Sequence, residues 1–220
     1  MNQTSLHILL TMGATIEPID PVRYLSNWSS GTLGCAVALA AATAGHKVTV
    51  LYGSQTKAPQ KHPRITTVSF DSTRDLRAKC EEYWPSQDVL IMAAAVSDFT
   101  PVRGAQTKKI RRSEAQSLEL VSTDDVVAEL AKSKRESQKV IAFSLAPETE
   151  LMDIATDKLN RKSVDAIVAN PLKTMNSSDI EFVILTRNGQ SLKPEKSISK
   201  AAFARWLVSK LPELCSETPS

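Results

Sequence analysis

TLGCAVALAAATAGHKVTVLYG, residues 32–53, changes from one secondary-structure pattern to another at Gly45. Its first half is rich in alanine, which favours a helix, and glycine is typical of the position just past a helix end. Its second half, residues 47–53, is rich in β-branched residues and predicts a strand. The apolar run at residues 6–12 predicts a buried strand before the helix. The order strand, helix, strand predicts a right-handed unit with two parallel strands.

The same alternation continues to the end of the chain. Further strands are expected at residues 64–70, 88–96, 139–145 and 164–170, and further helices at 72–84, 122–135, 149–162 and 197–211. Ser72 or Thr73 is expected to cap the second helix, and the Ser122-x-x-Asp125 pattern predicts a capping box at the third. The pattern predicts one α/β domain, residues 1–220, with a doubly wound, Rossmann-like and mostly parallel sheet.

The loops that follow the strands are the expected place for a site. In doubly wound sheets the ligand lies beyond the carboxyl ends of the strands, at the point where the strand order reverses. The loops concerned are residues 13–31, 53–63, 96–121, 144–149 and 170–179. Two β-rich extensions are also expected: a flap at residues 97–121 and a hairpin arm at residues 180–192. Asn188-Gly189 predicts a type I′ turn in that hairpin, and residues 213–220 are expected to fray.

The composition is that of a soluble globular protein. The 220-residue chain has 42% hydrophobic and 23% charged residues. Its net charge of +3 suits an anionic small molecule but is too small to predict nucleic-acid binding. Its sequence contains no apolar run of the ~20 residues that would span a membrane. Three separated cysteines, an odd number, favour a reducing cytoplasm over a disulfide framework or a zinc site.

RYLSNWSSGTLG, residues 23–34, places small hydrogen-bonding residues where the first helix begins. Free backbone N–H groups at a helix start favour phosphate, and Ser29, Ser30 and Gly31 would let it approach closely. Two interpretations remain open: these residues bind phosphate, or one serine only caps the helix. A dinucleotide site would require G-x-G-x-x-G directly after the first strand, where the sequence offers only Gly13. The Tyr-x-x-x-Lys pair of short-chain dehydrogenases is missing from the sequence.

Five segments resemble, in the same order, the signature segments of the phosphopantothenoylcysteine synthetases, or phosphopantothenate–cysteine ligases. They are LLTMGATIEPIDPVRYLSNWSSGTLG (9–34), DVLIMAAAVSDFTP (88–101), KIRR (109–112), DAIVAN (165–170) and MNSSD (175–179). The resemblance implies a two-step ligase of coenzyme A biosynthesis. The carboxylate of 4′-phosphopantothenate attacks the α-phosphate of a nucleoside triphosphate, CTP in typical bacterial members, and pyrophosphate leaves. The amine of cysteine then attacks the acyl-nucleotide, which gives an amide and CMP.

The resemblance also implies an assembly and a cofactor. In many bacteria this synthetase is fused behind a flavin-dependent decarboxylase. The present sequence begins almost at its first predicted strand. We therefore expect the stand-alone form here, without flavin and with a decarboxylase as a separate partner. A homodimer is expected, paired through residues 97–121 and 180–192. Mg²⁺ or a similar divalent cation is expected to bind together with the triphosphate.

Site residues follow from the resemblance position by position. Asn27 corresponds to the catalytic asparagine that holds the acyl-nucleotide, with an Asx turn before the helix as the alternative. Lys109 corresponds to the catalytic lid lysine, and a shift of one residue would select Lys108 instead. Arg23 is expected to bind a substrate phosphate or to anchor its loop to Asp20. Nucleotide or phosphate binding is implied for Gly13, Ser29, Ser30, Gly31, Ala95, Asp98, Phe143 and Asn170, with Asp98 also holding the metal ion.

The sequence departs from the family pattern at several positions. Ala14 replaces a glycine, and Thr32 and Ser122 stand where the family usually has basic residues. FSLAPET, residues 143–149, is an altered form of the family's Phe-x-x-Glu-Thr segment. The missing cations leave the choice between CTP and ATP open. The alternative functions are an NAD(P)-linked oxidoreductase on the same fold and a non-catalytic nucleotide-binding relative.

Overall fold

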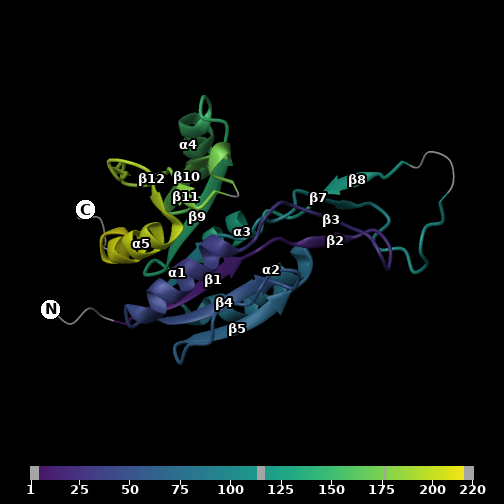
Figure 1. Cartoon of the computed structure of the whole chain (residues 1–220), viewed down its shortest axis with the longest axis horizontal. Helices are drawn as coiled ribbons and strands as arrows, with labels where there is room; N and C mark the ends of the chain where they lie inside the picture. Colours follow the sequence, from purple (N-terminus) through teal and green to yellow (C-terminus); the bar gives the residue numbers. More distant parts are fainter. Residues whose placement is uncertain (1–4, 113–116, 176, 216–220) are drawn as a thin grey trace.

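An eight-stranded, mostly parallel sheet with helices on both faces forms the body of the molecule (Figure 1). The structure is a computed structural model, and it describes residues 5–112, 117–175 and 177–215. The strand order is β13-β12-β10-β9-β6-β1-β4-β5, and the strands from β10 to β5 in this order are parallel to their neighbours. The strands are β1 (His7–Met12), β4 (Lys47–Gly53), β5 (Ile65–Phe70), β6 (Val89–Met92), β9 (Lys139–Ala146), β10 (Ala166–Pro171), β12 (Val183–Thr186) and β13 (Ser191–Leu192).

Two apolar cores lie on the two faces of this sheet. α1 and α5 cover one face, and α2, α3 and α4 cover the other. The alternation of side chains along a strand supplies both cores: Ile8 and Leu10 of β1 belong to the first and Leu9 to the second. The helices are α1 (Thr32–Thr43), α2 (Thr73–Tyr83), α3 (Val126–Ser133), α4 (Leu151–Arg161) and α5 (Lys200–Cys215). The predicted doubly wound fold is therefore confirmed.

The strand order reverses between β1 and β6. From β1 the chain moves outward through α1 to β4 and β5, and then returns to place β6 on the other side of β1. Pairing of the two strands continues past their ends, because the N–H of Ala95 donates to the carbonyl of Gly13 at 2.8 Å. This reversal is the expected place for a ligand in such a sheet.

An arm extends from the carboxyl ends of the strands, made of two small antiparallel sheets that contact each other (Figure 1). One pairs β2 (Ile16–Pro18) with β3 (Tyr24–Ser26), and the other pairs β7 (Phe99–Pro101) with β8 (Leu120–Ser122). The second sheet forms the base of the flap predicted at residues 97–121, of which residues 113–116 lie outside the described part. A third small sheet pairs β11 (Asp179–Ile180) with β14 (Ile198–Ser199) beside α5.

The predicted hairpin at residues 180–192 differs from the expectation in two ways. β12 is a buried strand of the main sheet, antiparallel to β10, so the hairpin forms the sheet edge and is not an arm. Its turn is not type I′, since Gly189 has a positive φ of 82° but Asn188 does not. The Thr186 N–H donates to the Gln190 carbonyl and the Gly189 N–H to the Thr186 carbonyl, both at 3.0 Å. The loop therefore has three residues, with Gly189 in the left-handed position of a bulge.

Helix starts agree with the sequence in one case and differ in another. Ser72 caps α2 as predicted, with its hydroxyl accepting from the Asp75 N–H at 3.2 Å. The capping box predicted from Ser122 is wrong, because Ser122 pairs with Phe99 in β8. Asp125 caps α3 instead, and its carboxylate accepts from the Ala128 N–H at 3.2 Å. Among the described helices, none combines the length and apolarity that a membrane span requires.

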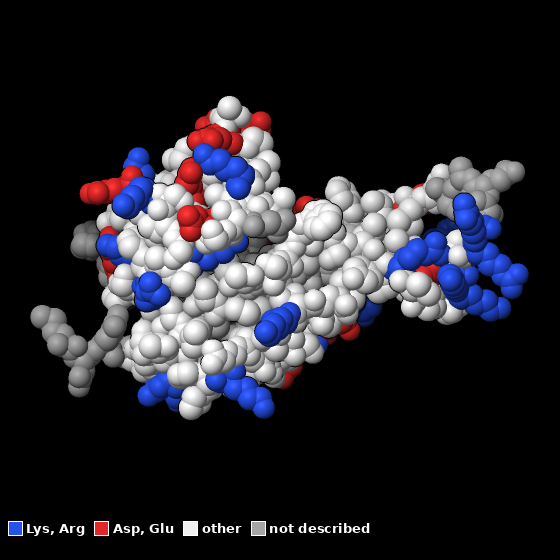
Figure 2. Space-filling model, in the orientation of Figure 1, with Lys and Arg blue, Asp and Glu red and all other residues white. Residues whose placement is uncertain are grey.

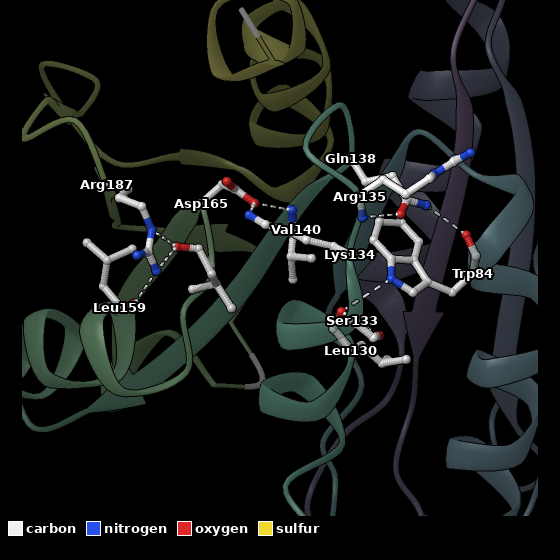
Figure 3. A network of polar contacts seen from close by, with 11 residues as sticks. Trp84, Leu130, Ser133, Lys134, Arg135, Gln138, Val140, Leu159, Asp165 and Arg187 are labelled. Carbon is white, nitrogen blue, oxygen red and sulfur yellow. Dashed lines mark hydrogen bonds and ion pairs between the residues drawn. The ribbon is translucent and has the colours of Figure 1, made fainter. Parts of the chain in front are cut away.

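A polar network closes the opposite end of the sheet, where β6, β9 and β10 begin (Figure 3). The buried Gln138 amide donates to the Trp84 and Gln87 carbonyls at 3.0 and 2.8 Å and accepts from the Arg135 N–H at 2.9 Å. Asp165 pairs with Lys134 and accepts from the Val140 N–H at 2.7 Å. The network satisfies backbone groups that the strands leave unpaired at their amino ends.

Replacing Gln138 by leucine is expected to lower the free energy of unfolding by about 2 kcal/mol, because the Trp84 and Gln87 carbonyls lose the buried amide that donates to both of them. Urea unfolding would measure this change. Gln60→Leu at an exposed position is the matched control and should leave the midpoint unchanged. Equal midpoints for the two variants would show that Gln138 does not stabilise the fold.

Candidate functional site

A cleft of about 850 Å³ opens at the carboxyl ends of the parallel strands, over the reversal between β1 and β6. Its walls come from the loop before α1, residues 26–34, and from the segment after β6, residues 92–99. The ends of β9 and β10, the starts of α3 and α5 and the C-terminal end of α4 also contribute to it. Four of the five loops expected to surround the site contribute to the cleft, and residues 53–63 do not.

The start of α1 presents unpaired donors to this cleft. Gly31 occupies the N-cap position with a φ of 71°. Because it has no side chain, it makes no capping hydrogen bond to the first turn of α1. The N–H groups of Leu33 and Gly34 find no acceptor in the part of the chain that the structure describes. The hydroxyl oxygens of Ser30 and Thr32 lie 2.9 Å apart. The Ser30 hydroxyl also accepts a long hydrogen bond from the Thr32 N–H at 3.4 Å. Neither serine caps α1 fully, and the free N–H groups suit an anion.

Asn27 bridges the two walls of the cleft. Its side-chain amide donates to the Val96 carbonyl at 2.9 Å, which joins the loop before α1 to the segment after β6. The Asx turn offered as an alternative is not formed, since no backbone N–H donates to Asn27 among the described residues. An amide nitrogen carries two hydrogens, so one N–H and the carbonyl oxygen of Asn27 remain free for a ligand.

Three lysines that the sequence analysis did not select line the cleft: Lys158, Lys162 and Lys200. Lys162 pairs with Asp125 at 2.9 Å. Lys158 is half-buried, and within the described residues its ammonium has neither an ion pair nor a hydrogen bond. Burial and the neighbouring Lys162 lower the pKa of Lys158, while Asp98 opposes the shift. The spacing of four residues at the end of a predicted helix was the signal that could have identified this pair.

Among the described residues, the three carboxylates that line the cleft differ in whether they form ion pairs or hydrogen bonds within the protein. Asp124 pairs with Arg77 at 2.6 Å, and Asp125 caps α3 and pairs with Lys162. Asp98 is exposed, and its carboxylate has no hydrogen bond or ion pair within the described ranges. No group of three or more His, Cys, Asp or Glu side chains arranged for a metal occurs among the described residues. Protein ligands alone therefore do not build a metal cage here.

Several residues expected at the site lie where the sequence placed them. Asn27, Ser29, Ser30, Gly31, Ala95, Asp98, Phe143 and Asn170 all line the cleft. Asn170 donates its amide to the Thr174 hydroxyl at 3.0 Å, and Phe143 packs edge-on against Phe203 at 6.2 Å between ring centroids. Thr32 and Ser122, the two positions at which the resemblance implies basic residues in the family, also face the cleft. Gly13, Arg23 and Lys109 lie outside its lining.

Arg23 serves as an anchor in this structure. Its guanidinium binds the carboxylate of Asp20 and donates to the Ile110 carbonyl at 2.7 Å. The buried Asp20 carboxylate also accepts from the Ile110 N–H at 3.0 Å. The flap is thus held on the arm at the residue that follows Lys109. The hydrogen bond from Arg23 is the main reason that the pKa of Asp20 lies well below its ordinary value. The Ile110 N–H lowers this pKa further, and burial of the carboxylate opposes the shift.

Basic side chains gather at the far end of the arm (Figure 2). The described part of the flap contributes Arg103, Lys108, Lys109, Arg111 and Arg112, all exposed. The flap therefore presents a concentration of positive charge, while Lys109 itself is held away from the cleft.

The sequence model of a protein family described as "DNA/pantothenate metabolism flavoprotein C-terminal domain" matches residues 3–214. The chain belongs to this family. The match confirms the family resemblance that the five ordered segments predicted, and it extends over nearly the whole chain.

Proteins related to this family member carry two kinds of name. A cysteine/cysteine sulfinic acid decarboxylase from an unknown prokaryotic organism is 40% identical over 166 residues, 76% of this chain and 46% of that protein. The coenzyme A biosynthesis bifunctional protein CoaBC of Borreliella burgdorferi is 30% identical over 203 residues, 91% of this chain and 51% of that protein. The chain thus spans about half the length of these curated relatives.

A solved structure shares the fold of this family member over almost its full length. The DNA/pantothenate metabolism flavoprotein from Streptococcus pneumoniae superposes with a TM-score of 0.82 at 26% identity. The alignment covers 95% of this chain and 99% of that chain.

Asp20→Asn is expected to lower the Tm by several degrees at pH 7 and to expose the Ile110 amide to hydrogen exchange, because Arg23 loses its carboxylate partner. A carboxyl whose folded pKa is depressed stabilises the fold above its ordinary pKa of about 4. That contribution disappears as the pH falls through the folded pKa. The difference in Tm between the native protein and the variant should therefore shrink below pH 4.

The exposed Asp153→Asn on α4 is the matched control for this prediction. It should change neither the Tm nor the exchange of Ile110. Unaltered protection of Ile110 in Asp20→Asn would show that the carboxylate does not hold the flap.

Proposed function

We propose that this protein is a phosphopantothenate–cysteine ligase of coenzyme A biosynthesis. The 4′-phosphopantothenate carboxylate attacks the α-phosphate of a nucleoside triphosphate, and pyrophosphate leaves. The cysteine amine then attacks the acyl-nucleotide carbonyl, and the nucleoside monophosphate leaves. The family membership and the CoaBC relative support this proposal. The observation that carries it is one cleft in which Asn27, the start of α1 and Lys158 meet, and the α1 donors and Lys158 have no partner among the described residues.

The charges of the cleft suit the substrates of this reaction. A nucleoside triphosphate and 4′-phosphopantothenate are both anionic, and the start of α1 and Lys158 present positive charge without a fixed partner. Lys158 and Lys162 supply the cations that are missing at Thr32 and Ser122, and we propose that they bind the triphosphate. Binding of phosphate would compensate Lys158 for its partial burial.

Asn27 is proposed as the residue that holds the acyl-nucleotide. Its bond to Val96 orients the amide, and its remaining N–H is available for a phosphoryl or acyl oxygen. An amide stabilises developing negative charge there without reacting itself.

Lys109 is proposed to act when the flap leaves its anchor at Asp20 and Arg23. An ammonium brought in on closure would neutralise charge that builds on the α-phosphate, and a closed flap would keep water from the mixed anhydride. Lys108 is the alternative lysine. The concentration of positive charge on the flap supports attraction to an anionic ligand.

Asp98 is proposed to hold Mg²⁺ together with oxygens of the triphosphate. Mg²⁺ usually binds through one or two carboxylates plus substrate phosphates, and Asp98 is the cleft carboxylate without a partner in the described chain. The ion would neutralise charge on the triphosphate. CTP is the proposed nucleotide, from the resemblance of the sequence to the family.

A homodimer in the cytoplasm completes the proposal. Exposed apolar side chains on the arm support pairing between copies: Val22, Tyr24, Phe99, Val102, Leu120 and Val121. The cysteine usage supports a reducing compartment. The oxidoreductase alternative is not favoured, because the turn after β1, where a dinucleotide would bind, is packed against Thr56.

The test mixes purified protein, 4′-phosphopantothenate, cysteine and Mg²⁺ with CTP, ATP, GTP or UTP separately. Mass spectrometry follows the amide, and a coupled assay follows pyrophosphate. Amide formed with CTP in preference to the others supports the whole proposal, and amide with another nucleotide replaces CTP by that one. No amide with any nucleotide rejects the ligase, and CTP binding without pyrophosphate release would identify a non-catalytic relative.

Lys158→Gln is expected to raise the KM for the nucleotide about tenfold to a hundredfold, because a charge-assisted hydrogen bond contributes about 1.5–3 kcal/mol. The Tm should not fall, since within the described chain this ammonium pairs with nothing. Steady-state kinetics and thermal unfolding measure the two effects. Lys132→Gln, at an exposed position on α3, is the control and should match the native protein. A nucleotide KM equal to that of the control would exclude Lys158 from the nucleotide site.

Asn27→Asp is expected to lower kcat about a hundredfold, because a carboxylate repels the phosphoryl oxygens that the amide would hold. Single-turnover assays of acyl-nucleotide and amide would show which step slows. Asn160→Asp on α4 is exposed and serves as the control. If Asn27→Asp retains native rates for both steps, the role proposed for Asn27 is wrong.

A further inference from the structure

Three glycines from three separate parts of the chain surround the side chain of Thr56. Gly13 follows β1, Gly31 caps α1 and Gly53 ends β4. A Cβ atom at Gly13 would lie 2.2 Å from the Thr56 hydroxyl oxygen, and one at Gly31 would lie 2.4 Å from its Cγ2. At Gly53 the distance to the hydroxyl oxygen would be 3.3 Å. Thr56 therefore fills the space that these glycines leave beneath the start of α1.

The loop that carries Thr56 is itself fixed. The Thr56 N–H donates to the Gly53 carbonyl at 2.7 Å, which closes a tight turn directly after β4. The Ser54 N–H donates to the Phe70 carbonyl at 2.8 Å, which ties the turn to the end of β5. Thr56 is therefore held by the sheet, while Gly31 faces the cleft on its other side.

The shape of Thr56, more than its polarity, explains its contacts. Its hydroxyl makes no hydrogen bond within the described residues, so the side chain acts as a β-branched wedge. Thr56 does not line the cleft, and so it would not touch a substrate bound there. Its effect on substrates is therefore indirect, and Gly31, which caps α1 and lines the cleft, links Thr56 to the donors of α1.

We propose that Thr56 is the positioning residue of the anion-binding loop: it supports Gly31 and so aims the free N–H groups of Leu33 and Gly34 into the cleft. This inference rests on the proposed function for the identity of the anions, the nucleotide and 4′-phosphopantothenate. It also gives Gly13 a role, because the absence of a side chain at Gly13 leaves room for the side chain of Thr56.

The kinetic test compares Thr56→Ala with Thr56→Val. The alanine removes the wedge and is expected to raise the KM for the nucleotide or for 4′-phosphopantothenate about tenfold, since small displacements of a binding group lower its effectiveness steeply. The valine keeps the branched shape and should behave like the native protein. The KM for cysteine, which carries no phosphate, should be unchanged in both variants, whereas a general structural defect would alter it. Native KM values for both phosphate-bearing substrates in Thr56→Ala would overturn the proposal.

A second test measures the contact by thermal unfolding. Gly31→Ala should lower the Tm less in a Thr56→Ala background than in the native protein, because the Thr56 methyl group, the nearer of the two groups that block a Cβ there, is then gone and only Met12 Cε at 2.9 Å remains. The penalty of the positive φ is present in both backgrounds and cancels. Gly34→Ala is the matched control: its Cβ would lie 2.3 Å from Met12 Cβ, so its effect should be the same in both backgrounds. Equal rescue of the two alanine substitutions, or no rescue of either, would contradict the contact.

Failure of the ligase proposal can be distinguished from failure of the positioning role proposed for Thr56. If the native protein makes no amide, calorimetric titration with inorganic pyrophosphate replaces the KM measurement. Weaker binding of pyrophosphate by Thr56→Ala than by Thr56→Val would support the positioning role. Equal binding by the two variants would overturn it, whatever reaction the protein performs.

Discussion

Burial of the parallel strands on both faces is the constraint on which the rest of this structure depends. β1 sends Ile8 and Leu10 into one core and Leu9 into the other, so neither face of the sheet is free for polar chemistry. Polar groups must therefore gather at the ends of the strands. At the amino ends they satisfy one another around Gln138 and Asp165. At the carboxyl ends, where the strand order reverses between β1 and β6, they remain open to a ligand.

The open end is not simply positive. Three of the charged side chains that line it have partners within the protein: Asp125 pairs with Lys162, and Asp124 pairs with Arg77. In the described residues this leaves Lys158, Lys200 and Asp98 without partners, and Asp98 is near enough to Lys158 to influence it without forming an ion pair. An anion paired with a metal ion satisfies charges of both signs, which is the charge pattern of a metal-bound triphosphate.

The strands and helices were predictable because their apolar periodicity is strong, and β4 begins and ends where the sequence placed it. The cap of α3 was not, since Ser122 satisfies its backbone in β8 and the signal of Ser-x-x-Asp is local. Resemblance located Asn27 and Asp98 in the cleft, because these residues belong to continuous motifs. Lys158 was missed because its four-residue spacing from Lys162 does not show which way that side of the helix faces, and only the packing of α4 beside α3 places both lysines at the cleft. The contact of Gly13 with Thr56 joins loops 43 positions apart and was equally invisible.

The separation between the two ends of the sheet has a consequence for how such a protein changes over generations. Robustness resides largely in the apolar faces and in the network at the amino ends, whereas the chemistry resides at the carboxyl ends. Substitutions at the cleft, for example at Thr32 or Ser122, need not disturb the groups that hold the strands together. A lineage can therefore exchange one set of cleft cations for another while its folding remains under separate selection.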